Sequence, residues 1–328
     1  MQSSQPTKVL TARRLPRSMS NDLEILNTRP KKNDVDSRRP YAYLFEPECS
    51  SNGTIVDVAT IFLTNRECPF HCLMCDLWKN TTDQRVPVGA IPEQIDFALS
   101  QLKEASQIKL YNSGNFFDAQ AIPTEDHLQI AQRVRQFENV IVENHPKLCG
   151  NQCVRFRDLI KTNLEVAIGL ETVHEKTLQS LNKQMTLDDF RNAVEFLLDR
   201  QISVRAFILL KPPFMSEQEG VDWAIRSIDF AFSLGVSCCS VIPTRDGNGI
   251  MELLGQRGSF APPRLASMEA VIVQGLRLDG GRVFIDLWDA QRFSSCANCV
   301  SARIERMQQM NLTQTILPSI SCDCEKVA

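Results

Sequence analysis

Short apolar runs alternate with longer amphipathic segments along most of the chain. The runs have the length and the β-branched content that are typical of buried strands. We expect strands at residues 55–63, 108–111, 140–143, 164–170, 203–210, 236–242 and 283–287. The segments between them repeat apolar residues at helical spacing. They predict helices at residues 91–104, 124–137, 156–161, 217–234 and 262–276, with another that begins near Thr186.

This alternation predicts an α/β fold in which parallel strands are joined by crossover helices. About six strand–helix units in series are fewer than the eight of a closed TIM barrel. The sequence therefore predicts an incomplete parallel (β/α)6 barrel of the TIM-like type. In parallel barrels, ligands bind at the C-terminal ends of the strands, so the residues that directly follow each strand are the first place to look for chemistry.

Charge is distributed unevenly along the chain. Residues 1–40 hold nine Lys/Arg and four Asp/Glu, whereas the remaining residues hold 27 and 35, so the two parts carry +5 and −8. We expect residues 1–40 to form a basic, disordered arm, residues 41–287 to form the core, and residues 288–328 to form a cysteine-rich extension. An acidic body binds phosphates poorly, although the arm or a local basic patch leaves contact with RNA open.

Nothing in the apolar pattern indicates a membrane protein. No uninterrupted apolar run reaches the roughly 20 residues that a helix needs to span a bilayer, and the first residues lack the apolar stretch of a secretory signal. We therefore expect a cytoplasmic location. The first 20 residues carry Arg and Ser without an acid, which leaves a transit peptide as the alternative.

Three cysteines follow the first expected strand with the spacing C-x3-C-x2-C. They are Cys68, Cys72 and Cys75. Iron–sulfur clusters are held by cysteine thiolates, usually four for a [4Fe–4S] cluster, so three thiolates on one loop leave one iron open to another ligand. The alternatives are three buried structural cysteines or part of a zinc site.

This loop and its context resemble the radical S-adenosylmethionine superfamily. The resemblance implies that Cys68, Cys72 and Cys75 bind a [4Fe–4S] cluster whose fourth iron is chelated by the methionine moiety of S-adenosylmethionine. It implies reductive cleavage of this cofactor to a 5′-deoxyadenosyl radical, with an electron donor such as flavodoxin or ferredoxin. Met74 occupies a position that is often aromatic in this superfamily and packs on adenine; its thioether can make similar contacts.

Polar residues follow the other expected strands, where the same resemblance suggests further contacts. We expect cofactor contacts from Ser113, Gly114, Asn115 and Glu171, although the turn at 112–115 lacks a Glu. We expect the residues that act on the substrate to be Glu143, Glu171, Lys211 and Arg245. Each of these strand-end residues has the alternative role of a loop residue or a salt-bridge partner.

The resemblance extends to one branch of the superfamily, that of the elongator catalytic subunit and especially the radical subunit of archaeosine synthase. It runs through residues 65–78, 109–118, 166–186, 204–214 and 241–254 and continues to the C-terminus. It implies a modified tRNA base as substrate and, because no RNA-binding module is recognisable, a tRNA-binding partner subunit. The alternatives are an enzyme that acts on a peptide or small metabolite, and a non-catalytic metal-binding module.

A second group of cysteines lies near the C-terminus. Cys296 and Cys299 form a C-x2-C pair, and Cys322 and Cys324 follow 22 residues later. No histidine lies near them, so the spacing predicts an all-cysteine metal site. Zinc and an auxiliary iron–sulfur cluster share this ligand set, and free thiols are the third alternative. We expect a structural role, because a short C-terminal segment has little core of its own.

Overall fold

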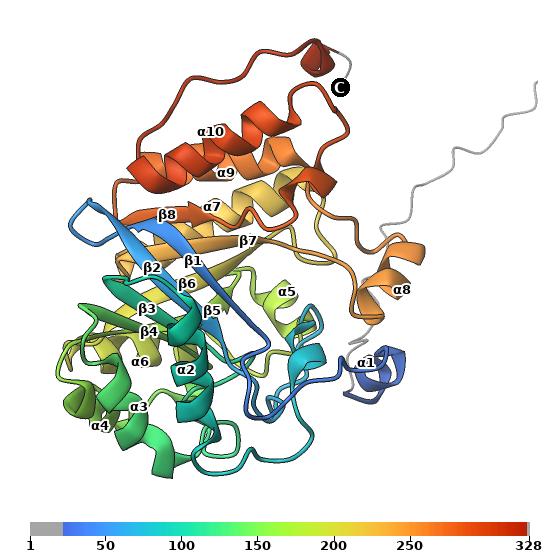
Figure 1. Ribbon diagram of the computed structural model, residues 1–328. Coiled ribbons are helices and arrows are strands. Elements are labelled where there is room, and N and C mark those ends of the chain that lie inside the picture. Colours follow the sequence, from blue (N-terminus) through green and yellow to red (C-terminus); the bar gives the residue numbers. More distant parts are fainter. Residues whose placement is uncertain (1–21, 327–328) are drawn as a thin grey trace, which may run out of the picture.

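The computed structural model describes residues 22–326 of the 328-residue chain. Within them, a single eight-stranded sheet has its strands in sequence order from β1 to β8, curls into an open barrel, and carries its helices on the outer face (Figure 1). Strands β2 to β8 run parallel to one another, and β1 is antiparallel to β2. This is the incomplete parallel barrel that the alternation predicted.

The parallel strands coincide with the expected apolar runs. They are β2 (Ile55–Phe62), β3 (Gln107–Tyr111), β4 (Asn139–Asn144), β5 (Asn163–Glu171), β6 (Ser203–Leu210), β7 (Cys238–Pro243) and β8 (Arg282–Ile285). Their side chains are mostly buried on both faces, and in β5 every residue after the first is buried. Strands covered on both faces read as continuous apolar runs, which is why the sequence marks them so clearly.

Six helices lie where the amphipathic pattern predicts them. The larger helices are α2 (Ala90–Gln101), α3 (His127–Val134), α4 (Asn151–Ile160), α6 (Leu187–Leu198), α7 (Glu217–Ser233), α9 (Leu265–Arg277) and α10 (Val300–Thr313), and the shorter ones are α1 (Asp22–Thr28), α5 (Glu175–Ser180) and α8 (Ile250–Gln256). The six predicted helices are α2, α3, α4, α6, α7 and α9, whereas α1, α5, α8 and α10 were not predicted. Thr186 caps α6 as expected, because its hydroxyl accepts from the Asp189 backbone N–H while the Asp189 carboxylate accepts from the Thr186 N–H. Among the described residues, no helix is long and apolar enough to cross a membrane.

Strand β1 (Ala42–Cys49) is the one strand that the apolar pattern misses. Its inward positions carry charge: Glu48 accepts from Lys109 of β3 over 2.6 Å and from Arg205 of β6 over 2.6 Å. The Cys49 carbonyl accepts from Arg282 of β8 over 3.0 Å. The Glu48 side chain therefore reaches β6 across the barrel, and the Arg282 side chain of β8 reaches back to the β1 backbone. A strand that contributes ion pairs instead of apolar side chains gives no period-2 apolar signal.

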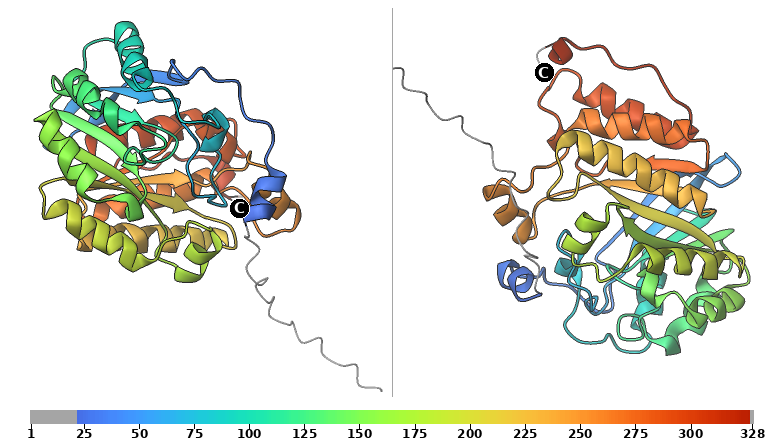
Figure 2. Two further views of the ribbon diagram at one scale, coloured as in Figure 1. Left: turned by 90° about the horizontal axis from the view of Figure 1, so that it is seen from below. Right: turned by 180° about the vertical axis from the view of Figure 1, so that it is seen from behind.

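Residues 22–40 are not the solvated arm that their charge suggested. Ile25 of α1 is buried with Leu73 and Met251, and α1 lies beside α8 near the open end of the barrel (Figure 2). Arg29 forms an ion pair with Glu67 at 2.5 Å and lies over the Trp78 ring. The basic residues hold this segment on the body because acidic partners face them. The rest of the expected arm, residues 1–21, lies outside the described residues.

Candidate functional site

The loop that carries Cys68, Cys72 and Cys75 follows β2 and is held by backbone contacts from other parts of the chain. The Asn182 amide donates to the His71 carbonyl over 2.8 Å. The Asn248 amide, from the segment before α8, donates to the carbonyls of Leu73 and Cys75 over 2.8 and 3.0 Å. Buried side-chain amides that satisfy loop carbonyls fix the path of a segment without regular structure. The loop therefore has one defined conformation at the C-terminal ends of the strands.

The three thiols of this loop lie in a desolvated environment. Burial raises the pKa of Cys72 to about 12, although the Lys183 ammonium opposes the shift, and burial also raises the pKa values of Cys68 and Cys75. Their sulfur atoms do not converge as the ligands of a single ion do; among the described residues, only the C-terminal cysteines form such a group. Three thiols on one loop without a common centre fit a cluster, in which each thiolate binds a different iron.

The turn after β3 contacts this loop directly. Asn115 donates from its side-chain amide to Cys68 Sγ over 3.1 Å, and its carbonyl oxygen accepts from the His145 backbone N–H over 2.7 Å. A Cβ on Gly114 would lie 3.2 Å from the Cys68 Cβ, so glycine allows the close approach of the two loops. Ser113 has a φ of 53° and bonds to the Tyr41 hydroxyl at 2.9 Å. The expected cofactor-binding turn thus supports the cysteine loop.

Glu143, at the end of β4, bonds to the turn after β3 that contacts the cysteine loop. Its Oε1 accepts from the backbone N–H groups of Asn112 over 2.6 Å and Gly114 over 3.2 Å. Burial raises the pKa of Glu143, and these N–H donors oppose the shift. The carboxyl group therefore holds the turn after β3 in place, and its role toward a substrate stays a prediction.

Glu171, at the end of β5, forms a buried ion pair with Lys183. The Lys183 Nζ donates to Glu171 Oε1 over 2.6 Å, and both side chains are at most 10% exposed. A Cβ on Gly169 would lie 2.2 Å from that oxygen and 2.4 Å from that nitrogen, so only glycine leaves room for the pair. Burial disfavours the ammonium, but the charges of Glu171, Cys72 and Cys68 raise the pKa of Lys183. The lysine therefore places a positive charge beside the cysteine loop.

Lys183 is a residue that the strand-end rule misses. It follows α5 rather than a strand, and the sequence around it shows no motif beyond its place in the resembling stretch 166–186. Only the folding of the α5–α6 connection over the end of β5 brings it to Glu171. Nothing in the sequence marks Lys183 as the partner of Glu171.

Lys211 and Arg245 bond to residues outside the group formed by the cysteine loop, Glu143 and Glu171. Lys211 donates to Glu217 of α7 over 2.6 Å and to the Pro262 carbonyl over 3.2 Å. Arg245 forms an ion pair with Asp286, beyond β8, at 2.8 Å and donates to the Trp288 carbonyl. Both are salt-bridge partners at strand ends, which was the alternative role for each residue. A catalytic role for either stays a prediction.

Backbone strain marks three of the strand ends. Ser113, Glu171 and Lys211 have φ values of 53°, 62° and 53°, in the left-handed region that non-glycine residues rarely adopt. Such conformations persist only where the surroundings impose them, and they gather at functional sites. For Glu171 the strain accompanies a shift of register between Gly169 and Glu171.

Met74 packs in the apolar cluster of Ile25 and Leu73, so its contact with adenine stays a prediction.

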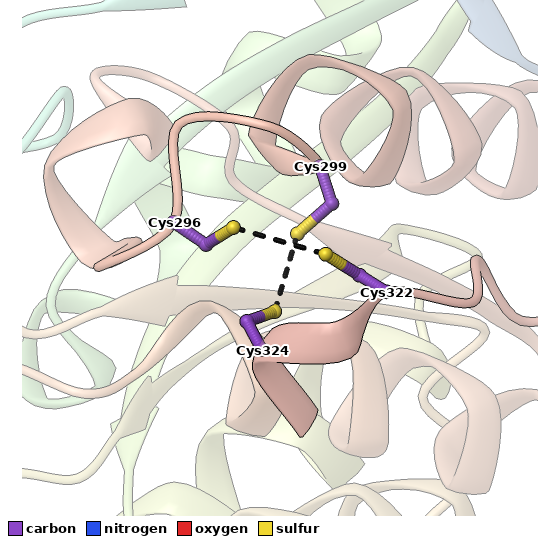
Figure 3. A group of neighbouring side chains, drawn as sticks. All are labelled: Cys296, Cys299, Cys322 and Cys324. Carbon is purple, nitrogen blue, oxygen red and sulfur yellow. Dashed lines mark hydrogen bonds between the residues drawn. The ribbon is translucent and has the colours of Figure 1, made fainter. Parts of the chain in front are cut away.

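The four C-terminal cysteines form a second site, far from the first in sequence. Cys296 and Cys299 precede α10, and Cys322 and Cys324 lie at the terminal turn, with all four side chains directed toward one centre (Figure 3). The backbone N–H groups of Cys299 and Asn298 bond to the Cys296 sulfur and lower its pKa to about 7. The pairing of 296–299 with 322–324 that the spacing predicted is therefore present, and the group can hold a metal ion.

Comparisons with known proteins give distant but extensive likenesses. No protein-family model matches the chain. An uncharacterised protein of Methanocaldococcus jannaschii is 23% identical over 90% of this chain and 88% of its own length. The archaeosine synthase subunit beta of Methanosarcina acetivorans is 24% identical over 84% of each chain. The protein of the same name from Thermococcus kodakarensis is 26% identical over 63% of this chain and 66% of its own.

One solved structure shares the fold over most of the barrel. It is the archaeal Elp3 of Methanocaldococcus infernus with an N-terminal deletion, which superposes with a TM-score of 0.51 at 15% sequence identity. The match covers 67% of this chain and 59% of that chain, so this chain spans about three fifths of the solved relative. At this identity, the likeness bears on the fold alone.

Proposed function

We propose that this chain is a radical S-adenosylmethionine enzyme whose [4Fe–4S] cluster is bound by Cys68, Cys72 and Cys75. The observation that carries the proposal is the cysteine loop itself. Three cysteines, one buried and two half-buried, follow the first parallel strand and do not converge on a single-ion centre, and the turn after β3 contacts Cys68. Ligand sites of parallel barrels lie at this end of the strands.

When bound, the cluster and S-adenosylmethionine supply one-electron chemistry for hydrogen abstraction. The residues of this chain hold that site in shape. Asn115 donates to Cys68, and Lys183, which Glu171 holds in place, brings its ammonium group near Cys72. Positive charge and N–H donors offset the negative charge of cluster thiolates. Ile25 of α1 packs against Leu73 of the loop.

As the substrate, we propose a modified base in tRNA. This rests on the two relatives named archaeosine synthase subunit beta. Because these relatives are named as subunits, we also propose a partner chain. The ion pairs of this chain support that proposal. On the described part of the arm, Arg29 and Lys32 bind Glu67, and Arg38 binds Glu93. These three cations are already paired with carboxylates, so the described part of the arm offers little free charge to phosphates, and a partner subunit would supply most of the tRNA affinity.

The test has two stages. Protein reconstituted anaerobically with iron and sulfide should hold about four irons at the first site, and the triple variant C68A/C72A/C75A should lose them together with cleavage of S-adenosylmethionine. Cys149→Ser is the matched control, because Cys149 lies near His145 but outside the C-x3-C-x2-C set. A triple variant that keeps the cluster spectrum and the cleavage would refute the cluster assignment.

The second stage addresses the substrate. Reduced enzyme and S-adenosylmethionine are incubated with total tRNA from a strain that lacks the gene, with and without candidate partner subunits encoded nearby. Digestion to nucleosides and mass spectrometry should show one changed nucleoside, with a larger yield when the partner is present. Unchanged nucleosides, with cleavage of the cofactor stimulated instead by a peptide or metabolite fraction, would replace tRNA by that class of substrate.

A further inference from the structure

The spacing of the C-terminal sulfur atoms distinguishes a single metal ion from a [4Fe–4S] cluster. Cys296 Sγ and Cys322 Sγ are 3.8 Å apart, and Cys299 Sγ and Cys324 Sγ are 3.7 Å apart (Figure 3). All four sulfur atoms lie within 4.8 Å of one another. The pairs cross, so that each sulfur of the first C-x2-C pair faces one sulfur of the second group.

These distances are those of a single tetrahedral ion. With a Zn–S bond of about 2.3 Å, the sulfur atoms of a regular tetrahedron stand about 3.8 Å apart. In a [4Fe–4S] cluster each thiolate binds a different iron, so the sulfur atoms are separated by the whole width of the cluster and cannot all lie as close as the ligands of one ion. We propose that Cys296, Cys299, Cys322 and Cys324 bind one Zn²⁺ in a closed tetrahedral site.

The surroundings of the site suit the charge of such a centre. Four thiolates and one Zn²⁺ carry a net charge of −2. Arg303, one turn into α10, donates to the Cys299 sulfur and also to Glu269 of α9 over 2.7 Å, and its side chain is 9% exposed. The backbone N–H groups of Asn298 and Cys299 point at Cys296. Partners of this kind orient the ligands and support their negative charge.

The ion would also decide where the last residues of the chain lie. Helix α10 is about 21 Å long at 1.5 Å per residue, and the segment after it returns along the helix to bring Cys322 and Cys324 beside Cys296 (Figure 1). Along the way, Arg306 of α10 donates to the Leu317 carbonyl over 2.8 Å. The return segment contains no strand or helix before residue 323, so the metal closes the only large loop at this end of the described chain.

Fixing α10 has a consequence for the sheet. Strand β8 is the edge strand beyond β7, and an edge has unpaired backbone groups. Asn311 of α10 both accepts from the Ile285 N–H and donates to the Ile285 carbonyl, each over 2.9 Å. Gln314 accepts from the Val283 N–H over 2.8 Å and donates to the Val283 carbonyl over 3.2 Å. Asn311 and Gln314, at the C-terminal end of α10, thus cap this edge.

The test begins with the metal content of the unaltered protein, purified anaerobically. Elemental analysis should find one zinc per chain, and zinc-edge absorption spectroscopy should find four sulfur neighbours at about 2.3 Å. The variant C68A/C72A/C75A should keep that zinc. The variants Cys296→Ser and Cys322→Ser should lose it, whereas Cys149→Ser should keep it. Amide exchange at Val283 and Ile285 should become at least tenfold faster in the zinc-free variants.

Two results would overturn the proposal. The first is iron and sulfide beyond the four irons of the first site, lost when Cys296 or Cys322 is changed. The second is protein without zinc whose four C-terminal thiols are alkylated as fast as exposed cysteines. If Cys296→Ser and Cys322→Ser do not fold, the metal content and the zinc-edge spectrum of the unaltered protein decide between these results.

Discussion

The side chain of Asn115 joins the end of β3 to the proposed cluster loop, because its amide donates to Cys68 Sγ over 3.1 Å. Hydrogen bonds to cluster sulfur atoms tune the reduction potential. We predict that Asn115→Ala makes the potential more negative, since the reduced cluster carries more negative charge and loses a donor. A one-electron couple shifts by about 59 mV for each factor of ten in its equilibrium constant, and a loss of tens of millivolts is expected.

The measurement is a redox titration followed by electron paramagnetic resonance. Asn163→Ala is the matched control. Asn163 is the first residue of β5, at the end of the strand away from the cysteine loop, and it bonds to the Glu138 carbonyl. An unchanged potential in Asn115→Ala would show that the contact with Cys68 does not act on the cluster.

Lys183→Met should destabilise the protein strongly. It leaves the Glu171 carboxylate buried without its partner, and removal of one member of a buried ion pair costs about 3–5 kcal/mol. The double variant E171Q/K183M should recover much of that loss, because no unpaired charge remains. Denaturant unfolding of the cluster-free protein measures each value. Equal destabilisation in the single and double variants would mean that the pair contributes through packing and not through charge.

Gly169→Ala tests the same pair through its geometry. The added methyl group would overlap both Glu171 Oε1 and Lys183 Nζ, so the pair must move away from the cysteine loop. We predict a loss of stability and a lower iron content after reconstitution. Gly150→Ala is the control, because nothing lies within 4 Å of a Cβ at that position. A Gly169→Ala protein with unaltered iron content and stability would contradict the observed packing.

Stability should fall in mild acid because of His127. The imidazole lies among the rings of Phe116, Phe117 and Phe156, and burial lowers its pKa to about 4 from an ordinary value of 6.5. The folded chain keeps His127 neutral while the unfolded chain protonates it. Its contribution is therefore complete above pH 6.5 and is lost progressively as the pH falls from 6.5 toward 4.

The measurement is the free energy of unfolding at pH 7.5 and at pH 5. One pKa unit corresponds to about 1.4 kcal/mol. The loss of unfolding free energy from pH 7.5 to pH 5 should therefore be about 2 kcal/mol smaller in His127→Leu than in the unaltered protein. Phe117→Leu, in the same cluster, should lower stability at both pH values without altering the difference between them. An equal difference in His127→Leu and the unaltered protein would exclude this histidine as the source.

Deletion of residues 1–21 should weaken the binding of tRNA by the isolated chain. These residues carry four Lys/Arg and no acid, whereas the cations at 29, 32 and 38 are already paired with carboxylates. The slope of log affinity against log salt should become shallower by up to about 0.7–0.9 for each phosphate contact that is lost. Arg38→Gln is the control and should leave the slope unchanged. A larger effect from Arg38→Gln than from the deletion would place the RNA contact on the paired cations.

The seven parallel strands, the six larger helices between them and the four-cysteine group near the C-terminus could be predicted from the sequence. Strands that are buried on both faces appear in the sequence as continuous apolar runs. Ligand residues a few positions apart are close in space in any fold. Thr186 could likewise be read as the start of a helix, because a cap and its partner lie three residues apart. Each of these features depends on neighbours along the chain.

Strand β1, the ordered segment 22–40, Lys183 and the caps on the edge of β8 were decided by the tertiary structure alone. Glu48 meets Arg205 from 157 residues away, and Asn311 meets Ile285 only after α10 has folded back on the sheet. A charged or amide side chain reads as solvent-exposed in the sequence, and it becomes interior when a distant partner satisfies it. That pairing has no period and no fixed spacing, so it exists only once the sheet has curled and brought distant strands together.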